Sequence, residues 1–148
     1  MRAEQIAEAF PVVRSDSDAL EAVRLMAEQR LPGLLVTDPQ GRPVRILPAS
    51  QVVRLLVPAY ILDDPSLAGV LSEITADRVA DKLSGKTVDQ VLAQSPARVA
   101  AVNADDTIVE VAAIMARERS PLVAVVSGEQ LIGVITAARL LEAALAAR

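Results

Sequence analysis

The stretch VRSDSDALEAVRLMAEQRLPGLLV, residues 13–36, recurs as VNADDTIVEVAAIMARERSPLVAV at residues 102–125. The two segments lie 89 positions apart and share eight identical residues over 24 positions. Unrelated stretches of ordinary composition would share about one or two. The identities in the first copy are Val13, Asp16, Glu21, Met26, Ala27, Arg30, Pro32 and Val36. The chain is therefore predicted to contain two copies of one structural unit.

Each copy contains the sequence pattern of a capped helix. Asp18-x-x-Glu21 and Thr107-x-x-Glu110 are capping-box patterns, which mark helix starts. Apolar residues follow at the three- and four-residue spacing of one buried helix face. These residues are Leu20, Val23, Met26 and Ala27 in the first copy, and Val109, Ala112, Met115 and Ala116 in the second. We expect both methionines to lie in the core.

The helix of each copy is flanked by short apolar segments typical of buried strands. An extended segment precedes each helix, two apolar runs joined by a turn follow it, and a second helix closes the unit. The predicted strands are 11–13, 34–36 and 44–47 in the first copy, and 99–102, 122–126 and 131–135 in the second. The closing helices are expected to begin near Ser50 and near Thr136 or Ala137. Each copy is thus a βαββα unit.

A helical connector is predicted between the two units. Asp64-Pro65 has the pattern of a helix start, and Ser84-Gly85 that of a helix end. A further short helix opens at Thr87 and runs through Leu92. We therefore divide the chain into repeat one (residues 1–56), the connector (57–88) and repeat two (89–148). The expected fold class is α+β.

The composition excludes several classes of function. The chain of 148 residues has no histidine and no cysteine, which removes imidazole acid–base chemistry, thiolate nucleophiles and the usual zinc ligands. Its net charge of −4 argues against binding to a phosphate backbone. Phe10 and Tyr60 are its only aromatic residues, so it has no platform for stacking bases. We expect no enzymatic activity, no metal site and no nucleic-acid partner.

The sequence also lacks the features of a membrane or secreted protein. No apolar run approaches the roughly 18 residues of a membrane span. The first ten residues, MRAEQIAEAF, carry two glutamates and no long apolar stretch, unlike a signal peptide. We expect a cytoplasmic protein that does not insert into membranes.

The repeated pattern resembles the CBS domain, and two copies in tandem resemble a CBS pair, or Bateman module. The resemblance covers residues 5–56 and 89–146. Its best local match is LIGVITAARLL, residues 131–141, which follows the segment from Glu110 to Met115 at the proper distance. The resemblance implies that the two repeats pack through their small mixed sheets about a pseudo-twofold axis. It also implies a homodimer that regulates an enzyme or transporter on a separate chain.

The resemblance further implies a ligand cleft for AMP, ADP, ATP or S-adenosylmethionine. Mapped onto repeat two, the cleft residues are Ser95, Ala100, Ser120, Pro121, Thr136 and Arg139. Arg139 stands where the family has the aspartate that binds the ribose. A guanidinium accepts no hydrogen bond, and losing a charge-assisted bond costs about 1.5–3 kcal/mol. Arg139 is suited instead to pair with a phosphate.

Repeat one departs further from the family pattern. Pro48 stands at the position of Thr136, and Gln51 at that of Arg139. Pro48 offers neither a hydroxyl nor an N–H group, so Pro32 and Gln51 are weaker candidates for ligand contacts.

Each of these residues also has a purely structural explanation. Thr136 is equally suited to cap the helix that follows it, and Arg139 to pair with Glu142 one turn later. Two functions therefore remain open. The first is a regulatory CBS pair that senses an adenosine-type ligand and acts on a partner protein. The alternative is a ligand-free dimerisation or interaction module of the same fold.

Overall fold

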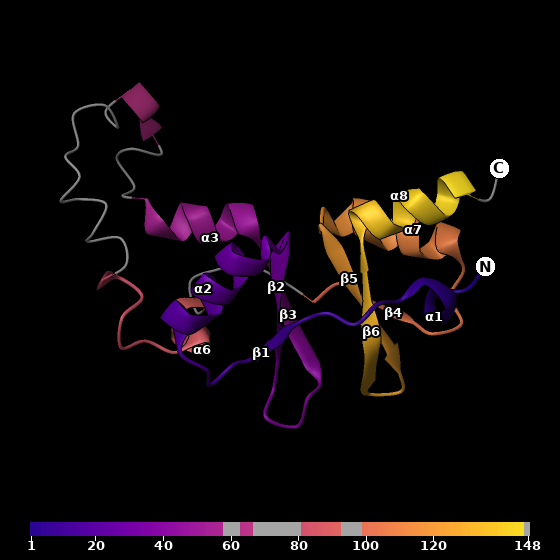
Figure 1. Cartoon of the computed structure of the whole chain (residues 1–148), viewed down its shortest axis with the longest axis horizontal. Helices are drawn as coiled ribbons and strands as arrows, with labels where there is room; N and C mark the ends of the chain where they lie inside the picture. Colours follow the sequence, from indigo (N-terminus) through magenta and orange to yellow (C-terminus); the bar gives the residue numbers. More distant parts are fainter. Residues whose placement is uncertain (58–62, 67–80, 93–98, 147–148) are drawn as a thin grey trace.

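The computed structural model describes residues 1–57, 63–66, 81–92 and 99–146. Two three-stranded sheets stand side by side, and helices cover them (Figure 1). In repeat one the elements are β1 (Val12–Arg14), α2 (Ala19–Gln29), β2 (Gly33–Thr37), β3 (Pro43–Pro48) and α3 (Ala49–Leu56). In repeat two they are β4 (Ala101–Asn103), α7 (Ile108–Glu118), β5 (Leu122–Ser127), β6 (Gln130–Thr136) and α8 (Ala137–Ala146). The predicted βαββα order and α+β class are confirmed.

The two sheets have the same mixed topology. The first strand of each repeat pairs in parallel with the second, and the second pairs antiparallel with the third. The strand orders are β1-β2-β3 and β4-β5-β6. The first strand of each hairpin, β2 or β5, therefore lies in the centre of its sheet. Gly41 and Gly128 adopt positive φ angles of 85° and 63° in the hairpin turns. Glycine reaches this region without the steric cost that a Cβ atom adds.

The helix starts follow the predicted caps. The side chain of Asp18 accepts a hydrogen bond from the backbone N–H of Glu21 at 3.0 Å. Thr107 and Glu110 form a complete capping box, in which each side chain accepts a bond from the other residue's backbone N–H. The N-terminus of α7 therefore has two capping hydrogen bonds, and the N-terminus of α2 has one.

The predicted helix face is partly wrong. Met26 and Met115 are buried as expected, with 8% exposure each. Val109, however, is 76% exposed, and Ala27 and Ala116 are also exposed. The buried face of each helix instead follows residues 19, 22 and 26 in repeat one and residues 111 and 115 in repeat two. Adjacent helix residues differ by about 100°, so a one-residue change in the assumed face places Val109 in solvent.

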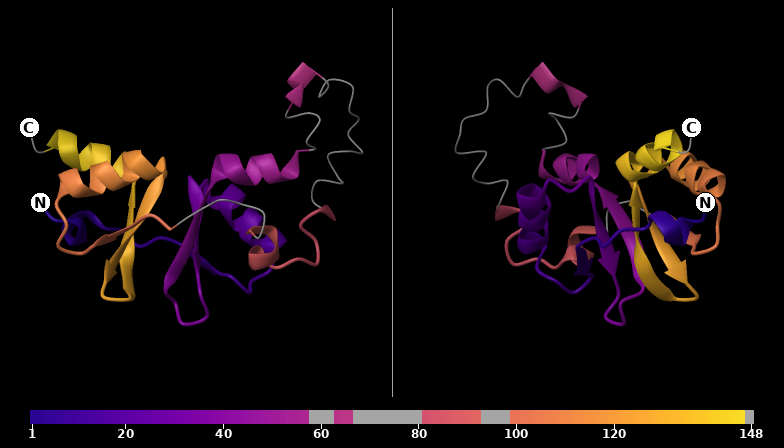
Figure 2. Two further views of the ribbon diagram at one scale, coloured as in Figure 1. Left: turned by 180° about the vertical axis from the view of Figure 1, so that it is seen from behind. Right: turned by 45° about the vertical axis from the view of Figure 1, so that its right-hand side comes forward.

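Two short helices, each preceding the first strand of one repeat, pack on the other repeat. Helix α1 (Ala3–Ile6) lies against β6 and α8 of repeat two, and α6 (Val88–Leu92) lies against α2 of repeat one (Figure 2). Arg2 forms an isolated bridge with Thr107, and Thr87 forms the equivalent bridge with Asp18. The helix before β1 therefore completes the packing of repeat two, and the helix before β4 completes the packing of repeat one.

The connector is described only in part. Helix α6 confirms the short helix predicted after Thr87, and Gly85 has the positive φ of 75° expected of a helix stop. Asp64 Oδ1 accepts hydrogen bonds from the backbone N–H and the hydroxyl of Ser66. Most of the helix predicted between Asp64 and Ser84, residues 67–80, lies outside the described residues.

The buried residues form two clusters, and one of them extends across both repeats. Leu35 and Ile46 of repeat one belong to the same buried cluster as the sheet residues of repeat two. A Cβ atom placed on Gly33 would lie 3.5 Å from Cδ2 of Leu122. Gly33 and Leu122 occupy equivalent positions in the two repeats, so a small residue faces a large one where the two halves meet.

Candidate functional site

Thr136 and Arg139 lie at the start of α8, where the resemblance places the ligand cleft of repeat two. The Oγ1 atom of Thr136 accepts a hydrogen bond from the backbone N–H of Arg139 at 3.1 Å. This is the geometry of an N-cap, in which the hydroxyl satisfies an otherwise unpaired N–H group. The structural explanation of Thr136 is therefore confirmed.

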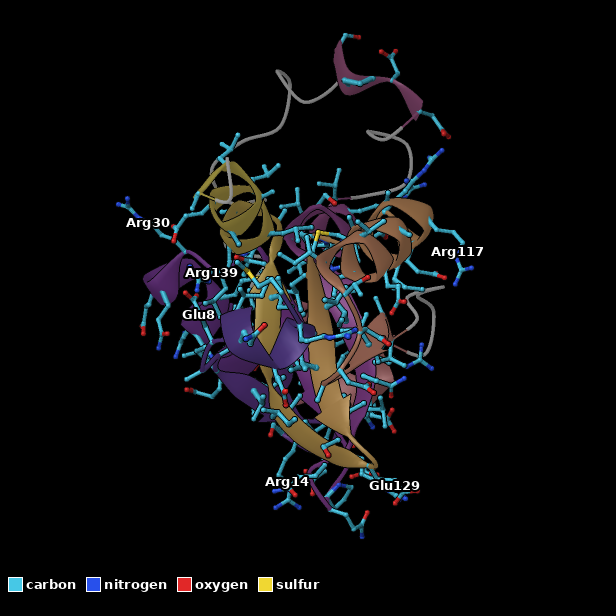
Figure 3. All side chains as sticks on the ribbon, turned by 90° about the vertical axis from the view of Figure 1, so that its right-hand side faces the viewer. Glu8, Arg14, Arg30, Arg117, Glu129 and Arg139 are labelled. Atoms are coloured by element: carbon cyan, nitrogen blue, oxygen red, sulfur yellow. The ribbon has the colours of Figure 1, made fainter. Side chains whose placement is uncertain are left out.

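The Arg139 side chain is held by three acceptors. Its Nη1 donates to Oε1 of Glu142 at 2.7 Å, which confirms the predicted pair within α8. Its Nε donates to the carbonyl oxygen of Ile6 at 3.2 Å and lies 3.4 Å from Oε1 of Glu8 (Figure 3). The side chain is only 27% exposed. Arg139 thus joins α8 to the segment that carries α1.

The charges around Arg139 do not favour an anion. Two carboxylates, those of Glu8 and Glu142, lie within 4 Å of one guanidinium. A phosphate that approached Arg139 would be repelled by these two carboxylates, which already balance the charge of the guanidinium. The arrangement is suited to fixing the position of the N-terminal segment.

The other cleft residues of repeat two also have partners within the fold. Ala100 is 2% exposed, and its carbonyl accepts a hydrogen bond from the N–H of Ala124 at 2.9 Å. The hydroxyl of Ser120 donates to the carbonyl of Leu122 at 2.5 Å. The carbonyl of Pro121 accepts from the N–H of Ala137 at 2.9 Å. Ser95 lies outside the described residues.

The equivalent positions of repeat one are less polar. Pro48 is the N-cap residue of α3 and makes no side-chain hydrogen bond there. Pro32 is exposed, and its carbonyl accepts from the N–H of Ala49 at 3.0 Å, as Pro121 does for Ala137 in repeat two. Gln51 is half-buried on α3. The backbone frame of the site is therefore common to both repeats, whereas Thr136 and Arg139 occur only in the second.

Sequence reasoning missed the N-terminal residues that meet Arg139. Ile6 and Glu8 belong to repeat one by sequence, yet they contact repeat two. One signal was present in the sequence, because Arg2-x-x-Gln5 near the start of repeat one matches Thr87-x-x-Gln90 near the start of repeat two. In both segments the glutamine side chain accepts a hydrogen bond from the backbone N–H three residues earlier.

An open hollow lies between the tips of the two hairpins. It is lined by residues 40–42 of repeat one and 129–131 of repeat two. Arg42 crosses it, with Nη1 3.6 Å from Oε2 of Glu129. Within the described ranges, no group of three acidic residues is placed to hold a metal ion, and no helix is long and apolar enough to cross a membrane.

Two α+β repeats with the same mixed topology form a tandem module, and comparisons with known proteins identify its family. The sequence profile of the CBS domain matches residues 3–58 and 95–146. The chain belongs to the CBS domain family, as the resemblance predicted.

Solved structures agree with this assignment. A CBS domain-containing protein of unknown function from Kribbella flavida DSM 17836 is 61% identical and superposes with a TM-score of 0.84, covering 98% of this chain and 99% of that one. CBSX2 in complex with AMP is 19% identical, with a TM-score of 0.69 and coverage of 99% and 97%. Hypoxic Response Protein I with two coordinated zinc ions is also 19% identical, with a TM-score of 0.67 and coverage of 96% and 98%. No curated protein matches the chain.

Proposed function

We propose that this chain is a regulatory CBS pair that works through protein association, without an adenosine-type ligand at Arg139. The observation that carries this proposal is the arrangement of Arg139, whose guanidinium is engaged by Glu8, Glu142 and the Ile6 carbonyl. The family's ribose acceptor is absent at this position, and the residue that replaces it has a structural partner on each side.

The surface that supports association is formed by apolar side chains on the covering helices. Val53 of α3, Val109 of α7, and Leu141 and Leu145 of α8 are 59–76% exposed. Helices α3 and α8 run along the same edge of the molecule at equivalent positions of the two repeats (Figure 1). In a twofold dimer the same patch of each subunit faces its partner, so exposed apolar residues on one patch can be buried against the same residues of a second copy. The proposed partner at this surface is therefore another copy of the chain, and the regulated enzyme or transporter is a separate cytoplasmic chain.

Sedimentation equilibrium at micromolar concentration tests the homodimer. The wild-type chain is expected to have the mass of a dimer, and Leu141→Glu that of a monomer, because the substitution would bury a charge in the interface. Ile132→Glu is the matched control, since Ile132 is an apolar residue that is 47% exposed on a strand, β6, and not on a covering helix. A monomeric wild-type chain contradicts the proposal, as does equal dissociation of both variants.

A second candidate function is sensing of an adenosine-type ligand. It is favoured by the hydroxyl of Thr136 at the start of α8 and by the AMP complex of CBSX2, a protein of the same fold. Thermal unfolding with millimolar AMP, ADP, ATP or S-adenosylmethionine separates the two candidates. A ligand at 100 times its dissociation constant adds about 2.7 kcal/mol of stability. We expect no shift in Tm with these ligands, and a shift of several degrees supports the second candidate.

A further inference from the structure

The N-terminal arm, defined as residues 1–8, is anchored on repeat two by its backbone. The N–H groups of Ala3 and Glu4 donate to the carbonyls of Asp106 and Ala104, at 2.8 and 2.9 Å. Glu8 exchanges two hydrogen bonds with Val134 of β6, both 2.9 Å long. The arm therefore extends the outer edge of β6 by one short strand-like contact, a mode of recognition that does not depend on which chain supplies the added segment.

Side chains make the docking specific. Ala3 and Ile6 are buried to 0% and 3% exposure within the core cluster of repeat two. Gly133 lets the arm approach, because a Cβ atom at this position would lie 2.8 Å from the carbonyl oxygen of Glu8. Arg139 then holds both Ile6 and Glu8. We call this surface of repeat two the docking face. It consists of the buried cluster that holds Ala3 and Ile6, Gly133 on the edge strand β6, and the cation of Arg139.

The chain joins the arm to β1 of repeat one through residues 9–11. The hydrogen bonds and ion pairs named above all run from the arm to repeat two. The residue after α1, Ala7, is already extended, with φ −63° and ψ 140°, and β1 begins only at Val12. The same contacts would form if the arm reached repeat two of a neighbouring molecule, which is the condition for exchange of an element between protomers.

The anchor of the arm also lies on the helix of the proposed dimer surface. Arg139 and Glu142 of α8 face the arm, whereas Leu141 and Leu145 of the same helix are exposed. We propose that the docking face of repeat two accepts the N-terminal arm of a second copy of this chain. The proposal rests on the self-association proposed above, which brings the arm of one copy close to α8 of the other.

Engineered cysteines can detect the exchange because the chain contains none of its own. Ala3 donates to the carbonyl of Asp106, so Arg2 and Thr107 form a bridge pair without direct hydrogen bonds between them. Such pairs have Cα atoms about 4.5 Å apart, within the range of a disulfide. Full-length Arg2→Cys and Thr107→Cys chains are mixed under mild oxidation, and the linked peptides are identified by mass spectrometry. A disulfide between position 2 of one chain and position 107 of the other is the expected result.

The pseudo-symmetric pair provides a matched control. Asp18 and Thr87 form the equivalent bridge, and Asp18, like Thr107, is the N-cap of a helix. Thr87 lies within the chain between the two repeats, so its segment is tethered at both ends. A mixture of Asp18→Cys and Thr87→Cys chains is expected to give at least tenfold less interchain disulfide. Equal yields in the two mixtures would overturn the proposal, provided that the Arg2→Cys/Thr107→Cys double variant closes within one chain.

A second measurement avoids any change at the helix cap. An Arg2→Cys chain at natural isotope abundance carries a spin label on its cysteine and is mixed with an isotope-labelled wild-type chain. The spin label should broaden the Thr107 amide signal of the wild-type chain. Unchanged Thr107 and Asp106 signals would contradict exchange. The sedimentation experiment separates the two proposals: a wild-type dimer without cross-links contradicts arm exchange alone, whereas a wild-type monomer contradicts the proposed self-association.

Discussion

The two repeats share one sheet topology but differ in the size of the side chains at equivalent core positions. Repeat one has Ala22 and Val52 where repeat two has the larger Val111 and Leu140. A cavity of about 20 Å³ lies beside Ala22 and Val52, enclosed by α2, α3, α6 and the hairpin strands. The comparison teaches that the fold requires the pattern of apolar positions, whereas the size of each residue decides how completely a repeat is packed.

The repeats also differ where α3 and α8 begin. Thr136 caps α8, and Arg139 of the same turn holds the N-terminal arm. Pro48 and Gln51 at the equivalent positions supply neither a side-chain cap nor a cation. The docked N-terminal segment therefore accounts for Arg139, whereas Thr136 is accounted for by the start of α8.

Truncation of Leu122 is expected to have the largest effect on stability. Leu122 is fully buried and packs over Gly33, its counterpart in repeat one. Leu122→Ala should lower the free energy of unfolding by about 2–5 kcal/mol, because it leaves a cavity where the repeats meet. Urea unfolding followed by circular dichroism measures the loss. Ile132→Ala, at an exposed position of β6, should cost no more than about 1 kcal/mol, and similar losses for the two variants would contradict the shared core.

Gly33→Ala and Gly133→Ala are expected to lower the stability by different amounts, because the backbone that each new Cβ atom meets differs in its freedom to move. A Cβ atom on Gly33 would lie 2.9 Å from the carbonyl oxygen of Leu47, which belongs to the same hairpin. Gly33→Ala should therefore cost about 1–3 kcal/mol, as overpacking does. Gly133→Ala should cost less, because the arm can move away, but should accelerate hydrogen exchange at the Val134 amide, whose acceptor is Glu8. Unchanged exchange at Val134 would show that the arm does not depend on Gly133.

Enlarging Val52 should make repeat one resemble repeat two. Val52→Leu introduces the residue type of Leu140 beside the cavity and should raise the free energy of unfolding by up to about 0.8 kcal/mol. The reverse change, Leu140→Val, should lower it by about 0.5–1.5 kcal/mol. Both are measured by urea unfolding, and a loss of stability in both variants would mean that the cavity cannot accept a methylene group.

The smallest expected effect concerns the hairpin turn of repeat one. Asp38 accepts hydrogen bonds from the backbone N–H and the guanidinium of Arg42, and these lower the pKa of its carboxyl below the ordinary value for aspartate. Because the folded pKa lies below the unfolded one, the stabilisation is complete above the unfolded pKa and is lost as pH falls through the folded pKa. A carboxyl titration by NMR should give a midpoint below the ordinary value for an aspartate side chain. A midpoint at or above this value would contradict the turn geometry.

The sequence predicts those features that depend on short spacing. Capping residues, turn glycines and apolar runs lie within a few positions of one another, so the strands and helices of both repeats could be assigned before the structure was known. The buried helix face was misjudged at Val109, because apolar residues occupy more than one side of α7. The partners of Arg139 were only half predicted: Glu142 lies one turn away, whereas Ile6 lies 133 residues away. No local pattern encodes a contact of that separation.

The crossed positions of α1 and α6 have a consequence for synthesis of the chain on the ribosome. Ile6 is made 133 residues before Arg139, and at about 5–20 residues per second this interval lasts roughly 7–27 s. During that time Ala3 and Ile6 have no binding site, because β6 and α8 do not yet exist. Helix α6, by contrast, emerges after repeat one and can dock on it at once. Repeat one can therefore close while the chain is still growing, and the earliest residues described are among the last to be buried.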